Sequence, residues 1–308
     1  MRLGIVGAGL AGLSCAWHAL QEGFEVTLFD KSGIGGGASG VSVGLMHPFP
    51  GKTASLSLRA EEGMRATKEL LKISQFLLGK PVASYTGIFR PAVTEQQKID
   101  FQKQQHPDAE WTQVSCPGLL AREGLWIAGG VTVFPHLYMQ GLWKGCEEMG
   151  ATLIREPFVE NSYFDKVILA AGSEILQFPE CKNLSLRTAL GQTLLCKSER
   201  PLPFSLASHG YIALTEDPHI CQIGSTYEHT KDPNPTKVAE LVDKVSLFYP
   251  EAKNLEVLKV RSGVRIAPRE GHLPVLEQVS KNTWVFTGLG SRGLLYHALF
   301  GQELVRAL

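Results

Sequence analysis

Three glycines near the N-terminus, Gly7, Gly9 and Gly12, are spaced as G-x-G-x-x-G between an apolar run and a helix-like stretch. Glycine at these positions permits a tight turn, close approach of the backbone to a pyrophosphate, and close packing of the following helix. The phosphates would lie at the positive end of that helix. Asp30 ends the next strand-like run, where its carboxylate can accept hydrogen bonds from ribose hydroxyls. These residues predict a dinucleotide site; the alternative for Asp30 is a solvated strand end beside Lys31.

Two further glycine-rich segments favour FAD over NAD as the dinucleotide. Residues 35–40 read Gly-Gly-Gly-Ala-Ser-Gly and follow the second predicted strand. NAD-binding dehydrogenases rarely carry such a loop there. Residues 288–293 lie between a predicted strand and a predicted helix, so their N–H groups and the helix dipole would face an anion. A plain helix start is the alternative for this second segment.

Two arginines are candidates for binding a substrate carboxylate, because a bidentate guanidinium suits that group better than an ammonium does. Arg265 follows a Gly-Val pair, and Arg292 lies in the C-terminal glycine-rich turn. Arg269 is close enough to compete with Arg265 for this role, and surface ion pairing is the alternative for both. His47 and Tyr227 are further polar candidates, with helix capping and sheet packing as their respective alternatives.

The periodicity of apolar residues predicts the elements that must hold these groups. A β-α-β unit opens the chain, with strands over 2–6 and 25–30 around a helix over 10–22, and a glycine-rich loop spans 33–44. Short strands are expected at 88–90, 125–127, 166–171 and 283–286, with a β-rich stretch over 185–264. Further helices are predicted over 54–78, 94–104, 136–149, 235–248 and 294–308.

This order of elements predicts an α/β fold in which a Rossmann-like FAD-binding domain is interleaved with an antiparallel-sheet substrate domain. The interleaving would explain why no linker of distinct composition is visible. The FAD-binding domain is expected over residues 1–80, 130–184 and 263–308. The substrate domain is expected over residues 81–129 and 185–262.

The composition is that of an ordinary globular protein with no bias toward a polyanionic partner. Among the 308 residues, 30 Lys and Arg balance 30 Asp and Glu. The six cysteines are scattered without a C-x-x-C pair, which predicts reduced thiols and no metal site.

The apolar N-terminus superficially resembles a signal peptide, but its glycines fit the dinucleotide turn better. No other run approaches the roughly 20 apolar residues of a membrane span, so a cytoplasmic, soluble protein is expected.

Several short motifs together resemble the D-amino-acid oxidase and glycine oxidase superfamily of FAD-dependent amine oxidoreductases. They occur in that family's order and cover essentially the whole chain. Within it, the chain is most similar to the FAD domain of the bifunctional enzymes that mature 5-methylaminomethyl-2-thiouridine in tRNA. Besides the N-terminal fingerprint and residues 35–40, the motifs are Gly44-Leu45-Met46-His47-Pro48, Ala170-Ala171-Gly172, Gly191-Gln192, Gly224-Ser225-Thr226-Tyr227-Glu228, Gly263-Val264-Arg265 and Gly288-Leu289-Gly290-Ser291-Arg292-Gly293-Leu294.

The resemblance implies that FAD is bound noncovalently along these motifs. No cysteine lies beyond Cys221 to form the C-terminal thioether that some relatives use, although His47 leaves a covalent link open. The C-terminal turn would face the flavin near N1 and the C2 carbonyl. The expected FAD-binding residues are Gly7, Ala8, Gly9, Leu10, Ala11, Gly12, Asp30, Lys31, Ala38, Ser39, Gly40, Gly44, Leu45, Met46, Ala171, Gly172, Gly290, Ser291, Arg292, Gly293 and Leu294.

The resemblance also implies a reaction, the oxidation of the C–N bond of a small amine or amino acid by hydride transfer to flavin N5. Arg265 and Arg292 would hold the substrate carboxylate, with His47 and Tyr227 nearby. One alternative is the oxidative removal of a carboxymethyl group from a modified tRNA wobble uridine. The balanced charge does not favour tRNA as a partner. A non-catalytic, flavin-binding subunit of a dehydrogenase complex is the alternative outside the enzymes.

Overall fold

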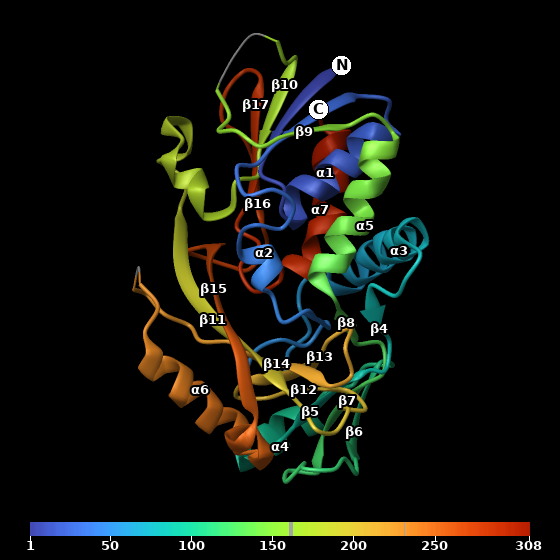
Figure 1. Cartoon of the computed structure of the whole chain (residues 1–308), viewed down its shortest axis with the longest axis vertical. Coiled ribbons are helices and arrows are strands. Elements are labelled where there is room, and N and C mark those ends of the chain that lie inside the picture. Colours follow the sequence, from blue (N-terminus) through green and yellow to red (C-terminus); the bar gives the residue numbers. More distant parts are fainter. Residues whose placement is uncertain (160–162, 231) are drawn as a thin grey trace.

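A six-stranded sheet forms one half of the protein in the computed structural model, which describes residues 1–159, 163–230 and 232–308 (Figure 1). The strand order is β16-β17-β10-β1-β2-β9, and all neighbours are parallel except β16 and β17. The N-terminal β-α-β prediction is confirmed. The strands are β1 (Arg2–Val6), β2 (Glu25–Phe29), β9 (Thr152–Ile154), β10 (Lys166–Leu169), β16 (Val275–Gln278) and β17 (Thr283–Thr287).

Four helices pack together beside this sheet in the upper half of Figure 1. They are α1 (Leu10–Gln21), α3 (Ala60–Leu78), α5 (Pro135–Glu148) and α7 (Gly293–Arg306). Small hydroxyl side chains join them by hydrogen bonds to facing carbonyls: Ser14 donates to His297 O at 2.6 Å and Thr67 to Leu294 O at 2.8 Å. These contacts fix α7 against both α1 and α3, so the start of α7 has a defined place.

An eight-stranded sheet forms the other half and carries its own apolar core. Its order is β15-β11-β14-β13-β12-β5-β7-β6, antiparallel throughout except between β12 and β5. The strands are β5 (Ile88–Pro91), β6 (Ala109–Gln113), β7 (Glu123–Ile127), β11 (Leu186–Lys197), β12 (Ser205–Ala207), β13 (Tyr211–Leu214), β14 (Ile220–Gly224) and β15 (Glu256–Pro268). Helices α4 (Glu95–Gln102) and α6 (Pro235–Ser246) accompany this half.

Short elements join the two halves. β3 (Leu45–Met46), β8 (Val131–Val133) and β4 (Ala83–Ser84) form a three-stranded sheet. In Figure 1 the long strands β11 and β15 run side by side upward from the lower sheet, and α2 (Ala38–Val41) lies beside β15. Among the described residues the 3₁₀ helices are η1 (Gly172–Gln177), η2 (Pro179–Cys181) and η3 (Pro250–Asn254). In the described part of the chain no helix is both long enough and apolar enough to cross a membrane.

The mixed α/β fold is as predicted, but some element bounds are not. The helix expected from residue 54 begins at Ala60, because Ala54 and Arg59 have φ of 53° and 55°, outside the helical region. The loop predicted over 33–44 contains the helical turn α2. The division into domains stays a prediction: its boundary at 263 falls within β15, and residues 160–162 lie outside the described residues.

Candidate active site

The first glycine-rich turn joins β1 to α1 beside the end of β10. Gly7 has φ of 106°, which disfavours any side chain, and a Cβ there would overlap the Ala170 carbonyl. A Cβ at Gly12 would overlap the Gly7 carbonyl oxygen. Only glycine therefore lets α1 begin so close to Ala170 and the adjacent Ala171, the two residues before η1.

Two side chains reach the N-terminal end of α1. The Ala8 N–H donates to Asp30 Oδ2 at 2.8 Å, and the Leu10 N–H donates to Ser39 Oγ at 3.1 Å. Asp30, which follows β2, and Ser39 from α2 therefore meet at one positive helix end. Their predicted contacts with FAD stay a prediction. Lys31 instead extends to Glu174 of η1, with Nζ 2.9 Å from its carboxylate.

The second glycine-rich loop brings this helix end to the eight-stranded sheet. Gly263 of β15 packs on Ala38, since a Cβ on Gly263 would lie 3.0 Å from Ala38 Cα. Gln222 Nε2 and Thr193 Oγ1 donate to the Val41 carbonyl at 3.2 and 3.4 Å. The segment from Ala38 to Val41 thus connects the α1 end with β11, β14 and β15, and the chain then enters β3 with Leu45 and Met46.

The C-terminal glycine-rich turn lies against the same strand. The Gly290 N–H donates to the Ile266 carbonyl of β15 at 2.8 Å. Gly293, the first residue of α7, lies beside Leu10 of α1, because a Cβ on it would be 3.5 Å from Leu10 Cδ1. The positive ends of α1 and α7 are therefore neighbours, and Gly290 in the turn before α7 lies against β15.

Arg265 is held flat against the neighbouring strand. Its Nη2 donates to the Thr226 carbonyl at 2.8 Å and to Ser225 Oγ at 3.2 Å. The guanidinium covers Gly191 of β11 so closely that a Cβ there would overlap it. Its Cζ also lies 5.8 Å from the centre of the Tyr227 ring. Burial lowers the pKa of Arg265, and nearby tyrosines oppose that shift.

Arg265, Arg292 and Tyr227 meet at one cavity of about 230 Å³ between β11, β15 and the C-terminal turn. Sequence reasoning missed two more of its lining residues, Arg187 and His272. The two-residue period of a strand could have pointed to Arg187, because it places that side chain on the same face of the sheet as Ala189. The lining is completed by Ala189, Ala267, Pro268, Gly271, Gly288, Leu289, Gly290 and Ser291.

The charge of this arginine cavity is entirely positive. Its described lining contains three arginines and no Asp or Glu. None of these arginines forms an ion pair within the described part of the chain. Burial lowers the pKa of His272, and Arg292 and Arg187 lower it further. Burial also lowers the pKa of Arg292, against a hydrogen bond with the Tyr296 hydroxyl. The cavity is therefore suited to an anion.

His47 does not line this cavity. It follows β3, and its Nδ1 accepts a hydrogen bond from the Phe49 N–H at 3.3 Å. Burial lowers the pKa of His47 to about 3, and Arg90 adds to the shift, so the ring is neutral at physiological pH. Its predicted role toward the substrate stays a prediction.

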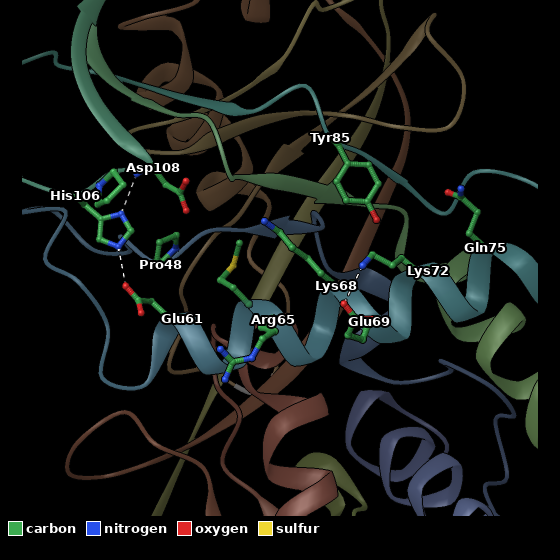
Figure 2. Close-up of a pocket in the computed structure, with 12 residues that line it drawn as sticks. Pro48, Glu61, Arg65, Lys68, Glu69, Lys72, Gln75, Tyr85, His106 and Asp108 are labelled. Atoms are coloured by element: carbon green, nitrogen blue, oxygen red, sulfur yellow. Dashed lines mark hydrogen bonds and ion pairs between the residues drawn. The ribbon is translucent and has the colours of Figure 1, made fainter.

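A larger groove of about 660 Å³ lies on the outer face of α3 (Figure 2). One of its cations is paired, since Lys72 Nζ lies 2.9 Å from the Glu69 carboxylate. In addition, His106 Nε2 lies 3.2 Å from Glu61 Oε1. Among the described residues the groove shares no lining residue with the arginine cavity, and it includes Pro48 from the Gly44–Pro48 motif. It is lined by Pro48, Glu61, Met64, Arg65, Lys68, Glu69, Lys72, Gln75, Tyr85, His106, Pro107 and Asp108.

Residues 2–307 match the family described as FAD dependent oxidoreductase, DAO. The chain belongs to this family. It is 26% identical to the tRNA 5-methylaminomethyl-2-thiouridine biosynthesis bifunctional protein MnmC of a Polaromonas species, an alignment that covers 99% of this chain and 56% of MnmC. The chain thus spans about half the length of the MnmC proteins that it matches.

Two further DAO-type proteins match over nearly their full length. The oxidoreductase ThiO of Rhizobium etli, provisionally assigned to thiamine biosynthesis, is 24% identical over 100% of this chain and 96% of ThiO. The crystal structure of glycine oxidase from Geobacillus kaustophilus superposes with a TM-score of 0.85 at 20% identity, covering 99% of this chain and 95% of the oxidase. The structural match to glycine oxidase shows that the two chains share a fold.

The residues present fit the FAD on which the DAO family depends. Asp30 and Ser39 lie at the α1 end, where a ribose and a pyrophosphate need an acceptor and donors. The α7 end lies next to it and offers N–H groups to an electron-rich ring. The six cysteines are buried free thiols.

Proposed function

We propose that this oxidoreductase uses FAD to oxidise the C–N bond of a small amine that carries a carboxylate. The observation that carries the proposal is the arginine cavity, where Arg187, Arg265 and Arg292 surround a small space without one acidic lining residue. Guanidinium groups in a partly buried site without a partner are costly unless an anion binds. A carboxylate is the anion that their bidentate geometry favours.

Each side chain has a defined part in this proposal. The Thr226 and Ser225 contacts fix Nη2 of Arg265, which orients the remaining N–H groups of the guanidinium. Arg292, directly before α7, lines the same cavity from the C-terminal turn. Between them a carboxylate would be held so that the adjacent amine carbon has a single orientation. FAD, when bound, supplies the hydride acceptor at N5, and water hydrolyses the resulting imine.

The test is an anaerobic titration of the FAD-loaded protein, followed by its visible absorption. Glycine, sarcosine and D-alanine are added separately, with methylamine as the matched amine that lacks a carboxylate. We expect bleaching by at least one carboxylate-bearing amine and none by methylamine. A fully FAD-loaded protein that none of the acids bleaches would contradict the proposal.

A second candidate is the removal of a carboxymethyl group from a modified tRNA uridine, favoured by the similarity to MnmC over nearly all of this chain. The equal numbers of acidic and basic residues argue against a strong polyanion surface. Binding of tRNA to the FAD-loaded protein at increasing salt separates the two candidates. Tight binding that weakens steeply with salt, together with bleaching by carboxymethylaminomethyl-uridine in tRNA alone, would replace the small-amine proposal.

A further inference from the structure

Arg187 and Arg265 project from the same face of two paired strands. In the antiparallel register of β11 and β15, Arg187 is opposite Ala267 and Arg265 is opposite Ala189. Residues two apart along a strand point to one side of the sheet, so the two arginines are diagonal neighbours on that side. Such diagonal neighbours are about 7–8 Å apart, which is within reach of long side chains. The small residues Ala189 and Ala267 leave the space between them open.

Arg187 adds a positive charge to this cavity that no ion pair offsets among the described residues. Arg187 is exposed at the edge of the cavity, whereas Arg265 is mostly covered. Across from them, His272 is close enough to Arg187 and Arg292 for both to lower its pKa. One monoanionic carboxylate between Arg265 and Arg292 leaves Arg187 without a partner.

We propose that Arg187, with His272 beside it, forms a second anion subsite, so that the substrate is an amine carrying two anionic groups. This inference rests on the proposed function and names its substrate class. One carboxylate binds between Arg265 and Arg292, and the second anion binds at the cavity edge. Arg187 is then a specificity residue: it selects dianionic amines and contributes little to the oxidation of monoanionic ones.

The experiment compares two amines that differ in one carboxylate. Iminodiacetate carries two carboxylates, and N-ethylglycine replaces one of them by a methyl group. The kcat/KM of each is measured with the FAD-loaded wild type, Arg187→Gln and Arg187→Lys. Arg122→Gln serves as the matched control, because Arg122 is also exposed and ionically unpaired among the described residues but lies beside β7, across the sheet from β15.

For Arg187→Gln we expect kcat/KM for iminodiacetate to fall about 10- to 100-fold, the range for losing a charge-assisted pair, and that for N-ethylglycine to change less than about threefold. Arg187→Lys should restore part of the loss. Equal losses on both amines would overturn the second subsite while leaving the proposed function intact. A wild type that oxidises N-ethylglycine faster than both iminodiacetate and the phosphate probe described below would also overturn it. Oxidation of neither amine by the wild type would count against the proposed function itself.

A phosphate-bearing amine would use the same subsite, so N-carboxymethyl-2-aminoethyl phosphate is the third probe. Loss of kcat/KM in Arg187→Gln on this probe but not on iminodiacetate would assign the second anion to a phosphate. Loss on both would assign the subsite to dianions in general. Loss on neither would overturn the inference.

Discussion

The arginine cavity and the α3 groove each contain three strongly cationic side chains, yet they differ in every other property that matters for binding. The arginine cavity has about 230 Å³ and no acidic lining residue. The α3 groove has about 660 Å³, but Glu61, Glu69 and Asp108 are among its lining residues. The three carboxylates of the groove offset its three cations, whereas no acid among the described lining residues offsets the three guanidinium groups of the arginine cavity. Charges on an exposed surface also exert little force on a ligand, whereas partly buried ones exert more. Unneutralised charge, rather than volume, therefore marks the candidate site.

The largest expected effect is that of removing the guanidinium of Arg265. Arg265→Ala should lower kcat/KM for a carboxylate-bearing amine about 100-fold or more, because truncating one partner of a buried charge pair costs about 2–5 kcal/mol. Steady-state kinetics of the FAD-loaded variant provides the measurement. Arg65→Ala in the α3 groove is the control and should change kcat/KM less than about twofold, since an exposed charge remote from the site contributes little. Similar losses in both variants would remove the distinction between the two cavities.

The second prediction concerns Gly191, against which that guanidinium rests. Gly191→Ala would place a Cβ where the Arg265 guanidinium lies. Because the obstructing group is the end of a flexible side chain, Arg265 should move while the sheet stays folded. We expect kcat/KM to fall about 10-fold or more, from a misplaced charge-assisted bond. Thermal unfolding should change by only a few degrees, and an unfolded variant would instead show that Gly191 is needed for the sheet.

The sequence alone predicts the glycine-rich turn at the start of α1 better than the arginine cavity, for a physical reason. A Cβ on Gly12 would overlap the Gly7 carbonyl oxygen, so the spacing of these two glycines reports their close contact directly. Arg187 reaches the cavity only through the register of β11 with β15, which no local pattern encodes. His47 follows the glycine-rich loop in sequence, yet its ring is outside the lining of the arginine cavity.

The start of α3 shows a similar limit. Helical periodicity continues back to Ala54, but Ala54 and Arg59 adopt positive φ. Arg59 does so where its side chain pairs with Glu62 and with Glu303 of α7. This pairing depends on how α7 packs against α3, so the sequence near residue 54 cannot reveal it. The predicted order of elements nevertheless held, because long periodic segments report their type more reliably than their ends.

The third prediction is a pH dependence confined to the arginine cavity. Burial, Arg292 and Arg187 lower the pKa of His272, so its ring is protonated at a lower pH than an ordinary histidine. A bound carboxylate should raise that pKa, so binding takes up a proton. The affinity for acetate should therefore increase as the pH falls, by about threefold, the size expected for one partly exposed charge. Acetate titrations of the flavin spectrum between mildly acidic and mildly basic pH provide the measurement.

His272→Asn is the matched variant, since it keeps a polar side chain but loses the titrating ring. Its acetate affinity should lose the increase at low pH. An increase that persists unchanged in His272→Asn would assign the proton to another group. An affinity that decreases on acidification would contradict the idea that added positive charge in this cavity favours anions.

The smallest effect is expected in the α3 groove, at the ion pair between Lys72 and Glu69. The two side chains are 69% and 60% exposed and lie three residues apart on the same helix. Solvent screens such a pair, so Lys72→Gln should change the free energy of unfolding by no more than about 0.5 kcal/mol. Denaturant unfolding measures the change in the free energy of unfolding, and kcat/KM measures any change in activity. A marked loss of activity in Lys72→Gln with unchanged stability would mean that the groove takes part in the reaction, and charge neutralisation would no longer separate the two cavities.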